Sequence, residues 1–259
     1  MKKQLFSCLL ALLMLLLCAC GSVRSGTDQS EEVRYTVPED AQEIASETNW
    51  TLYDNGLFVY TGSTMPFIFN HDEVPWFSYM DQIREVVIVK PVTEISEFAF
   101  LNCEHLERVT MPEGVRRISL SAFEGCSALK TINLPASLET IEFWAFSGCG
   151  LEEIVVPGMA KLSNYAFQSC SDLRRVVVCE GTGEIGFDVF EDCSALETIY
   201  LPASLNAIGV CTFRGCGSLT DVWYGGSRSS WDRIQIDGYN GPLLNALLHP
   251  DASPEDVIA

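Results

Sequence analysis

The stretch AFEGCSALKTINLPASLETIEFWAFSGC, residues 122–149, contains the phrase Ala-Phe-x-x-Cys twice, ending at Cys126 and at Cys149. The two cysteines are 23 residues apart, and similar apolar residues follow each of them. A phrase that recurs at a fixed spacing in the twenties is typical of a solenoid, in which each repeat forms one turn. This repeat therefore decides the fold.

The phrase recurs along much of the chain, with two degenerate copies near the end. Successive cysteines are separated by steps of 23, 23, 21, 23 and 23 residues. The short step lies in GCGLEEIVVPGMAKL, which lacks one residue before Leu151 and another before Leu162. The cysteine column is Cys103, Cys126, Cys149, Cys170, Cys193 and Cys216. The phenylalanine column is Phe100, Phe123, Phe146, Phe167, Phe190 and Phe213.

Each unit reads roughly Ile-x3-Ala-Phe-x2-Cys-x2-Leu-x2-Ile/Val-x-Leu-Pro-x2-Leu. The alternation in Leu-x-x-Ile-x-Leu predicts a short strand, which proline ends because it cannot donate the next ladder hydrogen bond. A helical turn then carries the Ala-Phe pair. One unit cannot bury its apolar side chains alone, so neighbouring units must stack. We predict a β-rich solenoid of short parallel strands and short helical turns, with about six full 23-residue repeats.

The unit resembles the BspA-type leucine-rich repeat of bacterial surface proteins, although it lacks the Asn of the commoner leucine-rich repeat. The resemblance covers residues 50–249. It implies a hairpin before the first turn, a half-repeat over residues 76–83 and a C-terminal cap. In the half-repeat, Phe77 takes the phenylalanine column and Met80 the cysteine column.

These patterns divide the chain into five parts. The predicted parts are a lipoprotein signal peptide at 1–19, a disordered acidic tether at 20–48, an N-terminal cap hairpin and half-repeat start at 49–82, a leucine-rich repeat solenoid at 83–224 and a C-terminal cap at 225–259.

The N-terminus begins with two lysines, continues with an apolar run from Leu5 to Leu17 and then reads Leu-Cys-Ala-Cys-Gly. The run is short for a transmembrane helix and has the length of a signal-peptide core. Its end resembles the lipobox of bacterial lipoproteins, which implies cleavage after Ala19 and acylation of Cys20. An ordinary secretory signal is the alternative. The acidic linker that follows is predicted to be extended.

The recurring cysteines have three possible roles. Equivalent positions should stack as an inward-facing ladder, where a free thiol behaves as a small buried hydrophobe. Disulfides between neighbouring turns stay open as an alternative in an exported protein. A zinc site would need converging pairs such as Cys-x2-Cys, which the mature chain lacks. Outside the ladder, Cys179 and Cys211 are predicted to be the more reactive thiols.

Charge and motifs argue against several functions. The chain has 16 basic and 35 acidic residues, a balance that repels nucleic acid and anionic lipid. It lacks Gly-x-Ser-x-Gly, His-Glu-x-x-His and phosphate-binding glycine loops, and its histidines, His71, His105 and His249, are dispersed. We therefore expect no enzyme, no metal, no cofactor and no nucleic-acid partner.

The predicted strands leave one candidate ligand face. Residues between inward positions form an outward row that becomes apolar and then aromatic, and Tyr224 follows it. Its members are Val155, Val177, Tyr200, Trp223 and Tyr224. Such a row suits a glycan or a protein partner, although β-branched and aromatic residues also favour exposed strand sites for their own sake.

The expected function is a non-enzymatic, lipid-anchored protein on the extracellular side of a bacterial cell membrane. The resemblance implies adhesion or interaction with an extracellular protein or glycan. One alternative is a carbohydrate-binding accessory lipoprotein that uses Tyr200, Trp223 and Tyr224 as its platform. Another is a structural spacer in the cell envelope.

Overall fold

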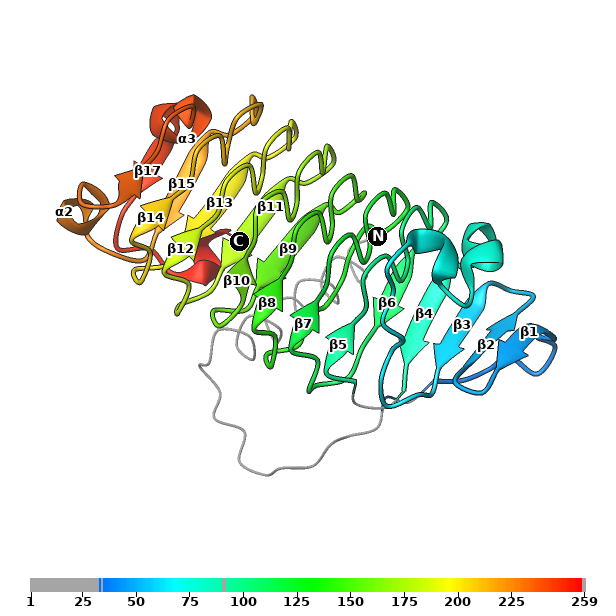
Figure 1. The fold of residues 1–259 in the computed structure, drawn as a ribbon. Helices are drawn as coiled ribbons and strands as arrows, with labels where there is room; N and C mark the ends of the chain where they lie inside the picture. Colours follow the sequence, from blue (N-terminus) through cyan, green and yellow to red (C-terminus); the bar gives the residue numbers. More distant parts are fainter. Residues whose placement is uncertain (1–32, 34, 90–91, 258–259) are drawn as a thin grey trace.

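The chain winds into a solenoid of stacked turns with a cap at each end (Figure 1). The structure, a computed structural model, describes residues 33, 35–89 and 92–257. The turns form three β-sheets, which we call the N-terminal, short-strand and C-terminal sheets. This is the β-rich repeat solenoid that the 23-residue period predicts.

The N-terminal sheet joins the cap to the first turns. Its strands, in spatial order, are β1 (Glu43–Glu47), β2 (Trp50–Tyr53), β3 (Leu57–Tyr60), β4 (Glu85–Ile88) and β6 (Arg108–Thr110). The first three are antiparallel, whereas β3, β4 and β6 are parallel. Two short 3-10 helices, η1 (His71–Glu73) and η2 (Phe77–Gln82), lie between β3 and β4.

Two sequence predictions about the cap are wrong. The tether was expected to continue to residue 48, but β1 lies within that range and pairs with β2. Val33 and Val37 also pack against the buried residues of β3. Residues 20–32 lie outside the described residues. In the half-repeat, Trp76 rather than Phe77 extends the phenylalanine column, since its ring stacks on Phe100 at 5.8 Å while Phe77 is 39% exposed.

The short-strand sheet follows one edge of the solenoid without interruption. It has seven parallel strands, each only two residues long. They are β5 (Glu94–Ile95), β7 (Arg117–Ile118), β8 (Thr140–Ile141), β10 (Lys161–Leu162), β12 (Glu184–Ile185), β14 (Ala207–Ile208) and β16 (Gln235–Ile236). The second residue of each strand is an Ile or Leu, and all but Ile236 are fully buried in the core. This column fixes the register from turn to turn.

The C-terminal sheet occupies the other strand face. Its parallel strands are β9 (Glu153–Val156), β11 (Arg175–Val178), β13 (Thr198–Leu201), β15 (Asp221–Tyr224) and β17 (Leu247–His249). The ladder on this face stops between β6 and β9, because residues 131–134 form no strand. The missing residue before Leu151 draws Gly150 so close to the Ser127 carbonyl that a Cβ there would lie 2.0 Å from the oxygen. The deletion therefore interrupts the ladder.

The third side of each turn carries the Ala-Phe phrase. The phenylalanine rings of consecutive turns stack with centroids 5.3–5.6 Å apart, and all six rings are fully buried. The residue before each Ala-Phe pair has a left-handed backbone, with Trp144 at φ 55° and Tyr165 at φ 64°. Backbone bonds such as Phe123 N–H to Ala145 O, at 2.9 Å, join adjacent turns. This side is thus a continuous aromatic and hydrogen-bonded column.

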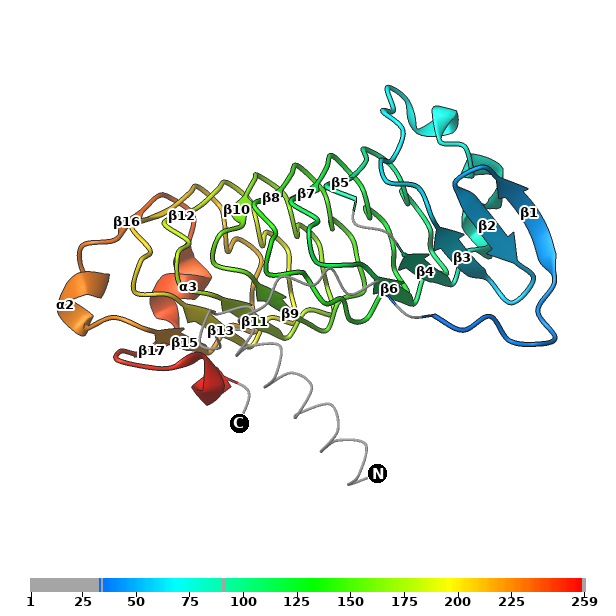
Figure 2. The ribbon, with the colours of Figure 1, turned by 90° about the horizontal axis from the view of Figure 1, so that it is seen from below.

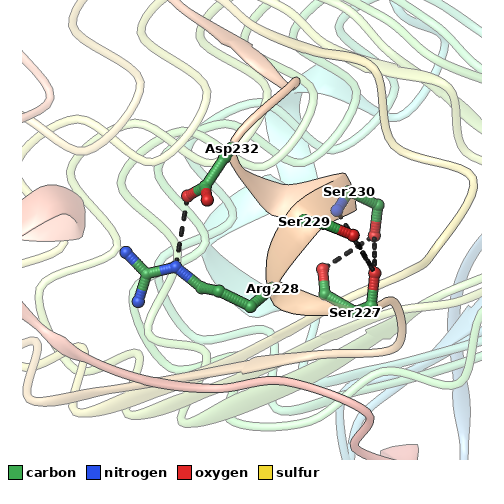
Figure 3. Close-up of polar contacts among 5 residues, drawn as sticks. All are labelled: Ser227, Arg228, Ser229, Ser230 and Asp232. Atoms are coloured by element: carbon green, nitrogen blue, oxygen red, sulfur yellow. Dashed lines mark hydrogen bonds and ion pairs between the residues drawn. The ribbon is translucent and has the colours of Figure 1, made fainter.

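The C-terminal cap closes the stack. It contains α2 (Arg228–Trp231), α3 (Gly241–Asn245) and the 3-10 helix η3 (Pro254–Val257), together with β16 and β17. Ser227 caps α2 because its hydroxyl accepts a hydrogen bond from Ser230 N–H, and Arg228 pairs with Asp232 at 3.1 Å (Figure 3). After β17 the chain turns back beneath the C-terminal sheet, where η3 lies near β11 and β13 (Figure 2).

Candidate functional site

The six column cysteines lie inside the solenoid. All are buried and all are free thiols. From the second copy onward each Sγ–H donates to a phenylalanine carbonyl of the preceding turn, for example Cys126 to Phe100 O at 3.2 Å and Cys149 to Phe123 O at 3.0 Å. The cysteine therefore fills a small apolar space and adds a weak bond between turns.

The two other described cysteines are also buried, against the prediction that they are the more reactive thiols. Cys179 is fully buried beneath the C-terminal segment, beside Tyr200 and Val257. Cys211 is mostly buried, and its pKa is raised, chiefly by burial and also by the Asp188 carboxylate. Since the thiolate is the reactive form, a raised pKa lowers the reactivity of Cys211.

The predicted ligand face is not open. Val177 and Tyr200 are buried, and Val155 and Trp223 are partly buried in the same cluster. The cover is the chain's own C-terminal segment, residues 250–257, which packs Val257 and Ala252 on this row. Two backbone bonds hold it there, from Asp251 N–H to Gly226 O at 2.9 Å and from Ala252 N–H to Tyr224 O at 3.0 Å.

The aromatic end of that row is covered as well. The His249 ring stacks on Trp223 with centroids 4.0 Å apart, and its Nε2 lies 2.7 Å from Asp221 Oδ1. This hydrogen bond is the main cause that lowers the pKa of Asp221. Tyr224 points into the core, where it is buried against Trp231. The predicted platform of Tyr200, Trp223 and Tyr224 is therefore not a surface, because the sequence pattern does not reveal where the C-terminal segment packs.

Removing the C-terminal segment is expected to uncover the row. Burial, Glu180 and the segment's Glu255 and Asp256 together raise the pKa of Tyr200 to about 12. Deletion of residues 250–259 should therefore make Tyr200 nitratable by tetranitromethane near neutral pH, since this reagent needs an accessible phenolate. Mass spectrometry of the nitrated peptides would measure the change.

Two tyrosines give internal controls for this deletion. Tyr239 is exposed and should be nitrated in both proteins, whereas Tyr60 is buried in the opposite cap and should be nitrated in neither. Equal protection of Tyr200 in the full-length and shortened proteins would show that the segment does not cover it.

A groove does open on the other strand face, above β10 and β12. It has a volume of ≈ 550 Å³ and is lined by residues 158–164 and 181–187 together with Phe143. Phe143 and Phe187 are 44% and 48% exposed, and Met159 is 73% exposed. Beside it, Trp144 and Tyr165 stack at 5.0 Å. This is the exposed aromatic surface that the described part of the repeats offers.

The sequence held a signal for this groove that the strand pattern did not use. Phe143 and Phe187 occupy a position where the intervening turn has Asn164, and these three residues flank the 21-residue step. A reading of the outward columns after each short strand, rather than only those of the longer strands, finds them.

The repeat itself identifies the family. Residues 93–220 match the family model described as a BspA type leucine-rich repeat region, in six copies. The chain is a BspA-type leucine-rich repeat protein. The architecture is one that presents an extended surface for interaction with other molecules.

Solved structures share the fold of this BspA-type protein. The Treponema pallidum leucine-rich repeat protein is 26% identical with a TM-score of 0.52, over 72% of this chain and 91% of the other. The pneumococcal vaccine antigen PcpA is 16% identical with a TM-score of 0.58, over 79% of this chain and 48% of the other. A leucine-rich repeat protein from Bacteroides ovatus is 21% identical with a TM-score of 0.44, over 78% and 66%. No curated protein sequence matches the chain.

Metal and membrane features can be assessed only for the residues that the structure describes. In them, no three His, Cys, Asp or Glu side chains are grouped so that they could hold a metal ion. No helix in the same ranges is both long and apolar enough to cross a membrane. The predicted lipidation site, Cys20, lies outside the described residues.

Proposed function

We propose that this protein is anchored by a lipid on Cys20 to the outer side of a bacterial cell membrane and binds an extracellular protein or glycan. The N-terminal apolar run and the Leu-Cys-Ala-Cys-Gly ending support the anchor. The BspA-type family supports a surface repeat protein that acts through interactions. Acylation by several chains on one residue would hold the protein firmly.

The observation that carries the binding role is the group of exposed aromatic side chains around the groove. Phe143, Phe187 and Trp144 are all exposed on one face of the solenoid. Large apolar side chains gathered on a surface usually mark a site of interaction. The longer-strand face, in contrast, has its apolar row covered by residues 250–257.

The anchor can be tested by proteinase treatment of intact cells, with a Cys20→Ala strain as the comparison. We expect the wild-type protein to be removed from the cells by the proteinase and the variant to be shed into the medium, because one acylated residue is the whole anchor. Immunoblots of cells and medium would measure both. Protection of the wild-type protein in intact cells would instead favour a spacer inside the envelope.

A further inference from the structure

The short turn hollows the surface of the solenoid. Ala160 N–H bonds to Pro157 O as Leu138 N–H bonds to Pro135 O, so Ala160 takes the place of Leu138. The next residue, Lys161, already pairs with Thr140, so one residue of the usual turn is missing. A smaller side chain and a shorter path together lower this turn below its neighbours and form the groove.

Aromatic side chains stand on both sides of the hollow. Phe143 comes from the turn before and Phe187 from the turn after, and both line the groove. Between them lies Asn164, whose Oδ1 accepts a hydrogen bond from Phe187 N–H at 3.1 Å. That bond fixes the amide, and among the described residues its Nδ2 has no hydrogen-bond partner.

The floor of the groove is polar and nearly neutral. Besides Asn164 it has the hydroxyls of Ser163 and Thr182, and its charged side chains are Lys161 and Glu184, one of each sign. Since the whole chain has a formal net charge of −19, an anionic ligand would be repelled. The lining suits a neutral molecule that has apolar faces and hydroxyl edges.

An extended peptide fits this floor less well. Peptides commonly bind by adding a strand to an unpaired sheet edge. Here β10 is paired with both β8 and β12, and β12 with both β10 and β14, so no strand edge is free beneath the groove. Recognition must therefore come from side chains above the sheet, as stacking on rings and hydrogen bonds to hydroxyls.

We propose that the groove between Phe143 and Phe187 binds a neutral saccharide, with a pyranose face packed on an aromatic ring and its hydroxyls bonded to Asn164, Lys161 and Glu184. The proposal deepens the proposed function, because it names the ligand class of its exposed face. The site differs in place and residues from the covered platform of Tyr200, Trp223 and Tyr224.

Affinity electrophoresis of the purified full-length protein tests the site. Native gels would contain dextran, mannan, galactomannan or mixed-linkage β-glucan as neutral probes, and heparin or polygalacturonate as anionic ones. We expect at least one neutral polysaccharide to retard the protein and neither anionic one to do so. The F143A/F187A variant should lose about tenfold or more in apparent affinity, since both stacking faces are gone.

The control variant changes two aromatic residues far from the groove. Phe67 and Phe69 are exposed in the N-terminal cap and contact each other, so F67A/F69A should bind as the wild type does. Phe143 and Phe187 are themselves largely exposed, so their loss should leave the thermal unfolding midpoint nearly unchanged. That measurement separates loss of the site from loss of the fold.

Three results would overturn the saccharide site: no retardation by any neutral probe, retardation by the anionic probes alone, or retardation that F143A/F187A does not change. These gels use purified protein, so their outcome is independent of where the cell places it. Surface display without retardation would remove the saccharide site but leave the proposed location intact. Retardation of a protein that is protected in cells would do the reverse.

Discussion

Phe146→Ala should destabilise the solenoid by about 3–5 kcal/mol. The ring is fully buried and stacks on Phe123 and on Phe167, each with centroids 5.3 Å apart and planes within 5°. Alanine would remove both ring contacts and leave a cavity between rigid neighbours. The free energy of unfolding, from urea titration followed by circular dichroism, would measure the loss.

A matched control lies three residues earlier in the same turn. Phe143 is the same residue type but is exposed in the groove, so Phe143→Ala should change stability by no more than about 0.5 kcal/mol. Similar losses for the two variants would contradict the assignment of Phe146 to the load of the core and of Phe143 to the surface.

Stability should also fall steeply above about pH 9. Burial is the main cause that raises the pKa of the thiols of Cys103, Cys149, Cys193 and Cys216, the last to about 12. In the unfolded chain these thiols ionise near their ordinary value of 9.0, whereas in the folded chain they keep their protons. The unfolded state therefore loses protons first, and the stabilising difference present below pH 9 is lost as the pH rises.

The size of the effect follows from linkage. Each such thiol lowers the free energy of unfolding by up to about 1.4 kcal/mol per pH unit, so four of them remove roughly 5 kcal/mol over the first unit. Urea titrations at steps from about pH 7 to about pH 10 would give the slope.

Other groups titrate in alkali, so the slope needs its own control. In C149A/C193A two of the four thiols are gone, and the slope above pH 9 should fall by about half even though the variant is less stable at every pH. An unchanged slope in this variant would show that the ladder thiols do not cause the alkaline loss.

The sequence predicted the solenoid because one repeated phrase sets its period, its buried columns and its strand order. Phe146 and Cys149 recur at equivalent positions, and a recurring position in a stack has one environment. Features outside the repeat have no such constraint. Trp76 stacks on Phe100 from a half-repeat whose register differs by one residue from the predicted one.

The candidate site was harder to predict for the same reason. Alternation along β13 correctly places Ile199 and Leu201 inward and Tyr200 on the opposite face, but it cannot show that Val257 lies over Tyr200. The groove depends on what one turn lacks relative to the next. A missing residue has no side chain to notice, and its effect appears only when neighbouring turns are compared.

The short turn has a further consequence for how such proteins diverge. In a close-packed globule, the loss of two residues from the interior would disturb every layer. Here the short-strand sheet passes the deletion unbroken, and the interruption on the other face ends within one turn. Because each turn touches only its neighbours, a deletion costs one local ladder and leaves a hollow in return. New recesses can therefore arise in this lineage by shortening the chain, without any new loop.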